Sequence, residues 1–225
     1  METPTAAARL EAVGFVLAGG RSSRMGRDKA LLPFAGRPLV AHAISILSQA
    51  GLSVSIAGAR PSARTALEAF APVVEDAEPG HGPLAGICAA LASASARYAV
   101  FQPVDLPLLP PALIAFLLHH ARITGQAVTV PSVTGFDQTF PAVLCSAVLP
   151  ALKAALDAGN DGCFSAFQAA AARQDQSISA VKVEFLAQSG QVADPLSLPP
   201  VRWFLNLNTP DDVQQAEVLL GRRIA

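Results

Sequence analysis

The sequence predicts an α/β fold of three layers, in which helices cover both faces of a mostly parallel β-sheet. Two observations predict it. Short apolar runs alternate with segments of helix length along the 225 residues, and this alternation is typical of strands joined by helical crossovers. The first run, over residues 13–18, is apolar and ends in Gly19 and Gly20, as expected of a strand buried on both faces of a sheet.

Proline, glycine and capping residues set the bounds of the predicted helices. Pro38 opens a helix that Gly51 follows, and Thr209 caps the last helix, which begins at Pro210. The predicted strands cover residues 13–18, 52–57, 72–75, 98–102, 127–131, 140–144 and 202–205. The predicted helices cover residues 38–50, 61–70, 83–94, 110–120, 150–158, 164–172 and 209–220. Pro, Ser and Gly in residues 188–200 indicate a surface loop.

The composition is that of a chain that folds around a large core. Hydrophobic residues make up 52% and charged residues 15%, whereas a disordered chain combines low hydrophobicity with high net charge. A chain of this length buries about 70% of its surface on folding. Because the sequence has no internal repeat and no linker, it predicts one domain over residues 1–225, with residues 1–11 as a short N-terminal extension.

Charge and apolar patterning exclude several classes of protein. There are 16 Lys and Arg residues against 17 Asp and Glu, a net charge of −1, so we expect no binding to nucleic acid. Every apolar stretch of ~18 residues is interrupted by a charge, a proline or a turn residue, so we expect no membrane span. We identify no signal peptide, and three widely spaced cysteines fit a reduced, cytoplasmic setting.

The first candidate site is the loop after the first strand, LAGGRSSRMGRDK over residues 17–29. Its glycines allow backbone N–H groups to approach an anion closely, and Arg24 and Lys29 could neutralise phosphates. The string matches neither GxxxxGK[ST] nor GxGxxG. Two interpretations therefore stay open on the residues alone: a phosphate-binding loop at the carboxyl end of a strand, or a basic surface loop.

Three further segments carry polar side chains at turns. Asp105 follows an apolar strand and lies between prolines. This position suits two roles equally well, that of a Mg²⁺ ligand and that of a turn or capping residue. Asp76 lies in a turn-rich loop before GPLAG, where a solvated acid is the simpler interpretation. Asn206 and Asn208 precede the last helix, where the plain interpretation is a helix cap.

The string LAGGRSSRMGRDKALLPFAGRPL, over residues 17–39, resembles the signature of the nucleoside-diphospho-sugar-transferase-like nucleotidyltransferases. The form of this signature that contains Asp28 and Lys29 is similar to that of the molybdenum cofactor guanylyltransferases. The resemblance implies a Rossmann-like nucleotidyltransferase fold. It also implies that Leu17, Ala18, Gly19 and Gly20 lie against the nucleotide, and that Lys29 lies on its phosphates.

The remaining motifs of the family are matched residue by residue. The resemblance implies that Arg24 stabilises the leaving pyrophosphate and that Asp76, ahead of GPLAG, contacts the nucleotide. It makes Asp105, in a D-x-P-x-L motif, the Mg²⁺ ligand and a further nucleotide contact. It implies that Asn206 and Asn208, in an NxNTPxD motif, bind the acceptor.

The activity that the resemblance implies is transfer of GMP from GTP to the phosphate of molybdenum-molybdopterin, with Mg²⁺ as cofactor. The products are a guanine dinucleotide cofactor and pyrophosphate. Transient contact with molybdenum cofactor insertion partners or apo-molybdoenzymes is also implied. Three alternatives stay open: a cytidylyltransferase for the same pterin, a nucleotidyltransferase for a sugar phosphate or another small phosphate, and a nucleotide-binding protein without catalysis. The last is disfavoured because a binding protein needs no phosphate clamp together with a metal carboxylate.

Two positions depart from the family's pattern. The better-known members carry an Asn in the loop after the second strand, where this chain has Ala57, so a side-chain contact to the base or ribose is missing. Residues 137–141 match the acceptor-binding segment only in part, because a His before Pro is common there and this chain has Phe140.

Overall fold

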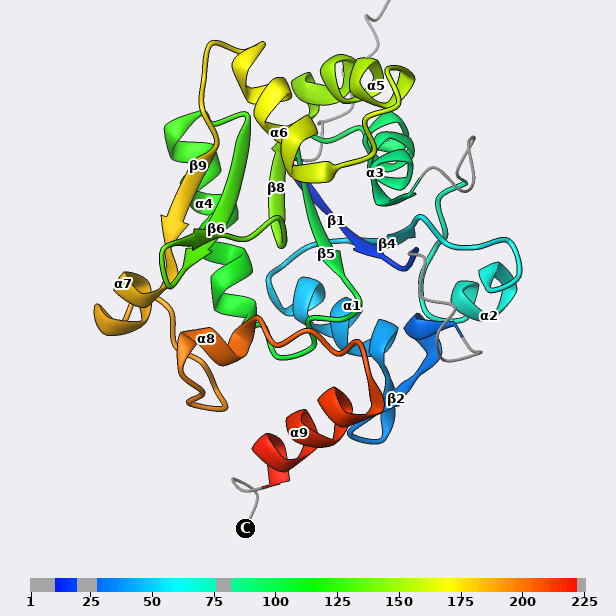
Figure 1. The fold of residues 1–225 in the computed structure, drawn as a ribbon, viewed down its shortest axis with the longest axis vertical. Helices are drawn as coiled ribbons and strands as arrows, with labels where there is room; N and C mark the ends of the chain where they lie inside the picture. The colour runs from blue at the N-terminus through cyan, green and yellow to red at the C-terminus, as the bar shows by residue number, and fades with distance from the viewer. Residues whose placement is uncertain (1–10, 20–27, 76–81, 222–225) are drawn as a thin grey trace, which may run out of the picture.

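A computed structural model describes residues 11–19, 28–75 and 82–221 of the chain. Its centre is a seven-stranded sheet in the order β4-β1-β5-β8-β6, with β7 and β9 both paired to β6 (Figure 1). The strands are β4 (Val54–Ala57), β1 (Ala12–Leu17), β5 (Tyr98–Pro103), β8 (Ala142–Cys145), β6 (Val128–Val133), β7 (Phe136–Asp137) and β9 (Ser179–Lys182). Only β8 and β7 run against the other five. The predicted α/β fold with a mostly parallel sheet is therefore confirmed.

Helices cover both faces of this sheet, which gives the three predicted layers (Figure 1). One face packs against α1 (Leu39–Gln49) and α4 (Pro111–Thr124). The other packs against α3 (Gly82–Ser93), α5 (Leu149–Asp157) and α6 (Cys163–Ala172). Alternate residues of β1 serve the two faces: Val16 lies in the first apolar cluster, Phe15 and Leu17 in the second. This is the period of two that a doubly covered strand requires.

Three glycines bring the ends of β1, β4 and α3 into close backbone contact. A Cβ atom on Gly19 would lie 2.0 Å from the carbonyl oxygen of Gly58, and one on Gly86 would lie 2.8 Å from the Gly58 Cα. Gly58 itself has a φ of 67°, in the left-handed region. Because no side chain larger than hydrogen fits between these backbones, the carboxyl edge of the sheet is closely packed here.

The segment before the last helix differs from the sequence prediction. The strand predicted over residues 202–205 is wrong: the chain forms a helical turn there, α8 (Pro200–Trp203). Pro200 suits the first turn of a helix, and Trp203, 1% exposed, donates from its indole nitrogen to the Leu198 carbonyl at 3.0 Å. The Trp203 side chain is thereby fixed in the core, and the chain enters the next segment as a loop.

Other differences are smaller. The strand predicted over residues 72–75 is a single bridge between Val73 and Ile56. The helix predicted over residues 61–70 is shortened to α2 (Arg64–Glu68). The sequence analysis did not predict β9, α7 (Val183–Gln188), or the small hairpin of β2 (Pro33–Phe34) and β3 (Arg37–Pro38). Two short 3₁₀ helices, η1 (Lys29–Leu31) and η2 (Ser146–Val148), complete the described elements before α9.

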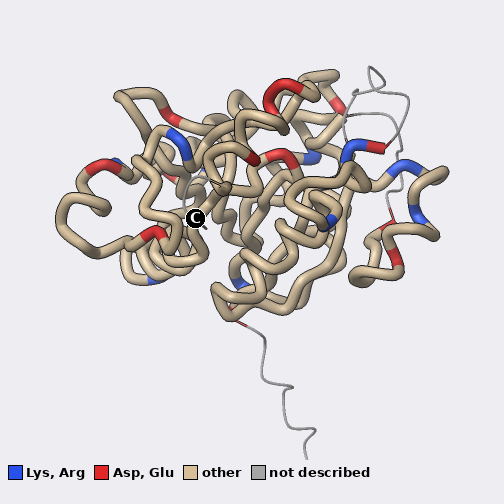
Figure 2. Tube along the Cα trace, turned by 90° about the horizontal axis from the view of Figure 1, so that it is seen from below, with Lys and Arg blue, Asp and Glu red and all other residues tan. Residues whose placement is uncertain are grey.

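The last helix, α9 (Pro210–Gly221), lies beside the β2–β3 hairpin (Figure 1). At that contact the Ala35 backbone nitrogen donates to Glu217 Oε1 at 3.0 Å. None of the helices in the described part of the chain is long and apolar enough to cross a membrane. Basic and acidic residues are interspersed over the described fold (Figure 2), so attraction of an anionic substrate depends on the local charges of its site.

Candidate active site

Asp105 lies at the carboxyl edge of the sheet, just beyond β5. Its backbone is held from two sides. The preceding residue, Val104, donates from its backbone nitrogen to the Leu17 carbonyl at 3.2 Å, which continues the pairing of β5 with β1. The Asp105 carbonyl accepts a hydrogen bond from the Leu207 backbone nitrogen at 3.0 Å. Ligands of open α/β sheets bind beyond this edge, so the position suits a residue that contacts substrate.

Lys29 reaches Asp105 from the short helix η1. Asp28 caps that helix, because its Oδ1 accepts from the Ala30 backbone nitrogen at 3.0 Å. The Lys29 ammonium donates to Asp105 Oδ2 at 2.8 Å and to Asn208 Oδ1 at 2.7 Å. The side chains of Lys29 and Asp105 are 13% and 22% exposed. The ion pair is therefore shielded from bulk water on most sides, yet a ligand can still reach both groups.

Asn206 contacts the Asp105 carboxylate, and Asn208 contacts the Lys29 ammonium that pairs with it. With its side-chain nitrogen turned toward Asp105, Asn206 donates to Oδ1 at 3.2 Å and to Oδ2 at 3.0 Å. Leu207, between them, is 1% exposed. It fixes this segment to the core, while its two neighbours face the site. The structure thus brings together Lys29, Asp105, Asn206 and Asn208, which the sequence analysis proposed from separate motifs.

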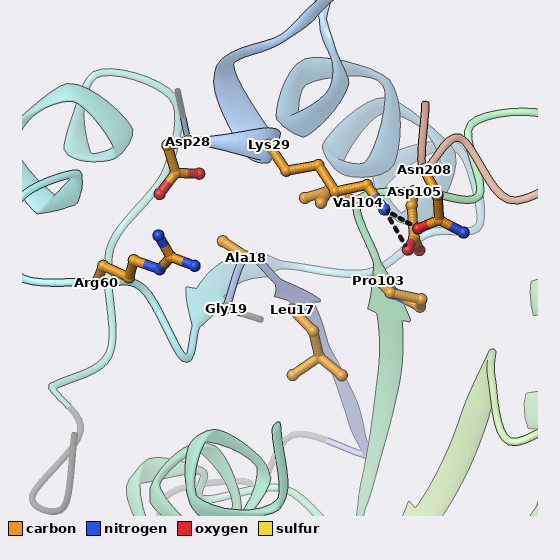
Figure 3. Close-up of a pocket in the computed structure, with 10 residues that line it drawn as sticks. All are labelled: Leu17, Ala18, Gly19, Asp28, Lys29, Arg60, Pro103, Val104, Asp105 and Asn208. Atoms are coloured by element: carbon orange, nitrogen blue, oxygen red, sulfur yellow. Dashed lines mark hydrogen bonds and ion pairs between the residues drawn. The ribbon is translucent and has the colours of Figure 1, made fainter. Parts of the chain in front are cut away.

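A cavity of about 230 Å³ opens beside this group (Figure 3). Its lining residues are Leu17, Ala18, Gly19, Asp28, Lys29, Arg60, Pro103, Val104, Asp105 and Asn208. Leu17, Ala18 and Gly19 therefore line the same cavity as Lys29 and Asp105. Gly20, Arg24 and Asp76 lie outside the described residues.

The sequence analysis did not predict two charged residues of this cavity. Arg60 extends toward it from the loop after β4, and Asp28 lies above it beside Lys29 (Figure 3). The pairing of Leu17 with both Ala57 and Pro103 shows that β4, β1 and β5 end side by side. A search of the loop after the second strand for charged residues would have found Arg60. Ala57 is fully buried, and its carbonyl accepts from the Ala18 backbone nitrogen at 3.0 Å.

A second cavity, of about 330 Å³, lies on the other side of Asp105. Its lining residues are Leu17, Gly19, Pro83, Pro103, Asp105, Leu106, Gln138, Thr139, Phe140, Phe204 and Asn206. It shares Leu17, Gly19, Pro103 and Asp105 with the first cavity. Asp105 therefore lies where two cavities meet, and one of them includes the segment singled out in the sequence for its partial match.

Asp105 supplies carboxylate oxygens of the kind that a hard divalent cation binds, but its described protein neighbours do not complete a coordination shell. Mg²⁺ prefers one or two carboxylates and completes its coordination with phosphate oxygens and water. Within the part of the chain that the structure describes, no three His, Cys, Asp or Glu side chains cluster as a metal site. Asp105 supplies one carboxylate, and the Lys29 ammonium lies between it and the Asn208 oxygen. A cation here would therefore depend on oxygens that the substrate brings.

Comparison with known proteins points to one family. The family model described as the MobA-like NTP transferase domain matches residues 14–176. A molybdenum cofactor guanylyltransferase of Shewanella pealeana is 32% identical over 97% of this chain and 97% of its own length. Another from Xanthomonas euvesicatoria pv. vesicatoria is 48% identical over 47% of this chain, and the match spans about half, 52%, of that relative.

The same fold occurs in solved structures. The molybdopterin-guanine dinucleotide biosynthesis protein A of Archaeoglobus fulgidus superposes with a TM-score of 0.74. The two chains are 21% identical, and the superposition covers 93% of this chain and 98% of the other. At this identity the likeness supports the fold alone.

Proposed function

Because the chain belongs to the family of MobA-like NTP transferase domains, we propose that it transfers GMP from GTP to the phosphate of molybdenum-molybdopterin. The products are the guanine dinucleotide form of the cofactor and pyrophosphate. The matches confirm the family resemblance that the sequence indicated, and the chain is a nucleotidyltransferase. Both curated relatives described above are named guanylyltransferases, so the cytidylyl alternative is not favoured.

The observation that carries the proposal is the position of Asp105 between two cavities, in contact with Lys29. A nucleotidyl transfer joins two substrates at one phosphorus atom. It therefore needs two binding cavities that meet at the groups that neutralise the phosphate charge. We assign the cavity with Lys29 and Arg60 to GTP, because it holds the cations. We assign the cavity with Asn206 and Phe140 to the pterin phosphate.

In the reaction, an oxygen of the acceptor phosphate attacks the α-phosphorus of GTP in line. The bond from that phosphorus to the bridging oxygen breaks, and pyrophosphate leaves with the bonding electron pair. No covalent bond to the protein forms, so the chain contributes positioning and charge neutralisation. Leu17, Ala18 and Gly19 hold the nucleoside against the sheet edge. Lys29 donates to phosphate oxygens, which stabilises the negative charge on the departing pyrophosphate.

Three residues outside the described part of the chain keep the roles that the resemblance implies. Gly20 lies against the nucleotide, Arg24 neutralises the leaving pyrophosphate, and Asp76 contacts the nucleotide. Asp105 would hold Mg²⁺, which when bound supplies further neutralisation of the phosphate charge. Asn206 orients the Asp105 carboxylate through two hydrogen bonds, so the carboxylate is fixed in direction before any ligand arrives.

The setting of the reaction is also part of the proposal. We expect the chain to work as one domain in the cytoplasm. We expect transient contacts with proteins that insert the molybdenum cofactor, or with apo-molybdoenzymes.

A nucleotide panel tests the proposed function. The purified full chain is incubated with molybdenum-molybdopterin, Mg²⁺ and each of the four nucleoside triphosphates in turn. Pyrophosphate release and the mass of the dinucleotide product are measured. We expect release with GTP that requires the pterin. Binding of GTP without any pyrophosphate release would favour the non-catalytic alternative. In a parallel reaction a sugar phosphate replaces the pterin, and release only in that reaction would favour the other transferase.

A further inference from the structure

The placement of Asn208 depends on a segment that lies outside the sheet. Its side-chain oxygen accepts from Lys29 at 2.7 Å, although the two residues are 179 positions apart in the chain. Leu207 fixes one side of Asn208 through its burial and its bond to the Asp105 carbonyl. The other side leads directly into α9, so whatever fixes the start of α9 also fixes Asn208.

Asp212 provides that fixation. Its Oδ2 accepts hydrogen bonds from two consecutive backbone nitrogens, Asn208 at 2.9 Å and Thr209 at 2.8 Å. In return, the Asp212 backbone nitrogen donates to Thr209 Oγ1 at 3.2 Å. Reciprocal bonds between Thr209 and Asp212 are a capping box, which orders a helix start. The additional bond to Asn208 is not needed to cap the helix, and it reaches back to a residue that contacts Lys29.

Both packing and hydrogen bonds hold α9 in place. Within α9, Ala216 is buried, and Val213, Leu219 and Leu220 are partly buried against the core. The hydrogen bonds with Thr209 and with the two backbone nitrogens lower the pKa of the Asp212 carboxyl below its ordinary value. Asp212 is therefore ionised at neutral pH, and a charged acceptor makes a stronger hydrogen bond than a neutral one.

We propose that Asp212 is a positioning residue for the transfer reaction: its carboxylate fixes the Asn208 backbone, so that the Asn208 oxygen holds the Lys29 ammonium against Asp105. The proposal rests on the proposed function only in assuming that Lys29 acts on nucleotide phosphates. Asp212 touches neither substrate, and it acts through Asn208.

Steady-state kinetics of three single variants form the first part of the test. Asp212→Ala removes both acceptor bonds, Asp212→Asn keeps an oxygen of similar position, and Asp211→Ala removes a neighbouring exposed charge from the same helical turn as a matched control. We expect Asp212→Ala to lower kcat about tenfold, the effect of losing one hydrogen bond to a charged group. Asp212→Asn should recover most of the activity, and Asp211→Ala should match the wild type.

A double-mutant comparison separates positioning from general structural damage. If Asp212 acts through Asn208, then Asp212→Ala should change kcat less than about twofold in a chain that already carries Asn208→Ala. A full tenfold loss in that background would overturn the proposal, because Asp212 would then act through another group. Wild-type kcat for Asp212→Ala in the native background would overturn it as well.

Chemical labelling tests the same claim without any catalytic assay. The chain has three lysines, Lys29, Lys153 and Lys182, and the last two are exposed. Under limiting acetic anhydride, we expect Asp212→Ala to raise acetylation of Lys29 relative to Lys182 at least about twofold. An unchanged ratio would contradict the proposal. If the wild type failed to transfer GMP but the ratio rose, the proposed function would fail while the role of Asp212 would stand.

Discussion

Two regions supply the candidate site, and different forces hold them in place. The strand-end region, residues 17–19 and 103–105, is fixed by sheet pairing and by the contact between Gly19 and Gly58. The C-terminal segment, residues 206–212, lies outside the sheet and is fixed by Leu207 and by the bonds to Asp212. The first region therefore cannot change without cost to folding, whereas the second can lose activity while the fold remains.

The family match divides the molecule at a similar place. The matched residues 14–176 include the strand-end region and stop before the C-terminal segment. The C-terminal segment nevertheless supplies both asparagines that contact the charged pair. Most of the sheet and the pair of Lys29 and Asp105 thus belong to the matched part, while the final placement of that pair depends on residues beyond it.

The largest effect is expected at Asp105, where the two regions meet. Asp105→Asn keeps the shape of the side chain and removes the charge that Lys29 and a divalent cation require. We expect kcat to fall at least ~10³-fold, or roughly 4 kcal/mol of transition-state stabilisation. The melting temperature should fall by only about 2–4 °C, since a partly exposed ion pair contributes about 1 kcal/mol.

Thermal unfolding and steady-state kinetics of the same preparation check this prediction. Loss of the fold together with full activity of the remaining native enzyme would assign Asp105 a structural role. The two regions would then meet at a residue that supports the fold and takes no part in the chemistry.

The next largest effect is expected at Lys29. Lys29→Ala removes the ammonium that bridges Asp105 and Asn208 and, in the proposed function, neutralises phosphate. We expect kcat/KM for GTP to fall roughly 10²- to 10³-fold, because a cation near a phosphate is worth several kcal/mol in a partly shielded site. Lys182→Ala, at an exposed lysine away from the site, is the control. Wild-type kinetics in the Lys29 variant would remove this residue from the mechanism.

A third change addresses the strand-end region by itself. Gly19→Ala places a Cβ atom 2.0 Å from the Gly58 carbonyl oxygen, so the backbone must move. We expect a loss of about 1–3 kcal/mol in the free energy of unfolding, accompanied by weaker GTP binding. Gly221→Ala, where a Cβ meets nothing within 4 Å, should be neutral. Equal stabilities in urea unfolding would show that this region is more adaptable than its packing indicates.

The smallest effect concerns His42, which lies in α1 and contacts the β2–β3 hairpin that lies beside α9. Its Nε2 pairs with the Phe34 carbonyl at 2.8 Å, and burial, aided by nearby Arg37, lowers the pKa of His42 below 6.5. The unfolded chain therefore binds this proton more readily than the folded one. The stabilising contribution is complete above about pH 6.5 and is lost as the pH falls toward the folded pKa.

Unfolding experiments at several pH values, with His42→Gln for comparison, measure this contribution. The wild type should lose stability more steeply than the variant between about pH 6.5 and 5. The same slope in both proteins would show that His42 does not couple the hairpin to pH.

The contrast between the two regions also explains what the sequence could predict. The strand ends near Leu17 and before Asp105 were predicted because an apolar strand followed by glycines or prolines marks a strand end directly, whereas the roles of these residues in the site came from the family resemblance. Their meeting follows from the parallel order of β4, β1 and β5. No local signal records that Asn208 contacts Lys29, because that contact depends on the path of the chain through α8, a helix where a strand was predicted.

Some residues and contacts of the candidate site were not predicted from the sequence, for a related reason. Arg60 has no motif of its own and enters the cavity only because β4 ends beside β1. Thr209 was predicted to cap the last helix, and the cap is present with Asp212 as its partner. That the same carboxylate also accepts from Asn208 depends on the backbone angles of one loop residue, which the sequence pattern does not encode.

The preference of the chain for GTP over CTP tests guanylyl transfer most directly. The purified chain is given equimolar GTP and CTP with molybdenum-molybdopterin and Mg²⁺, and the dinucleotide products are separated by mass. Ala57 offers no polar side chain to the base, so we expect discrimination to come from backbone groups of residues 17–19, which a wrong base leaves unpaired. The guanine product should exceed the cytosine product at least roughly tenfold, equivalent to ~1.4 kcal/mol. A predominantly cytosine product would contradict guanylyl transfer and make the chain a cytidylyltransferase.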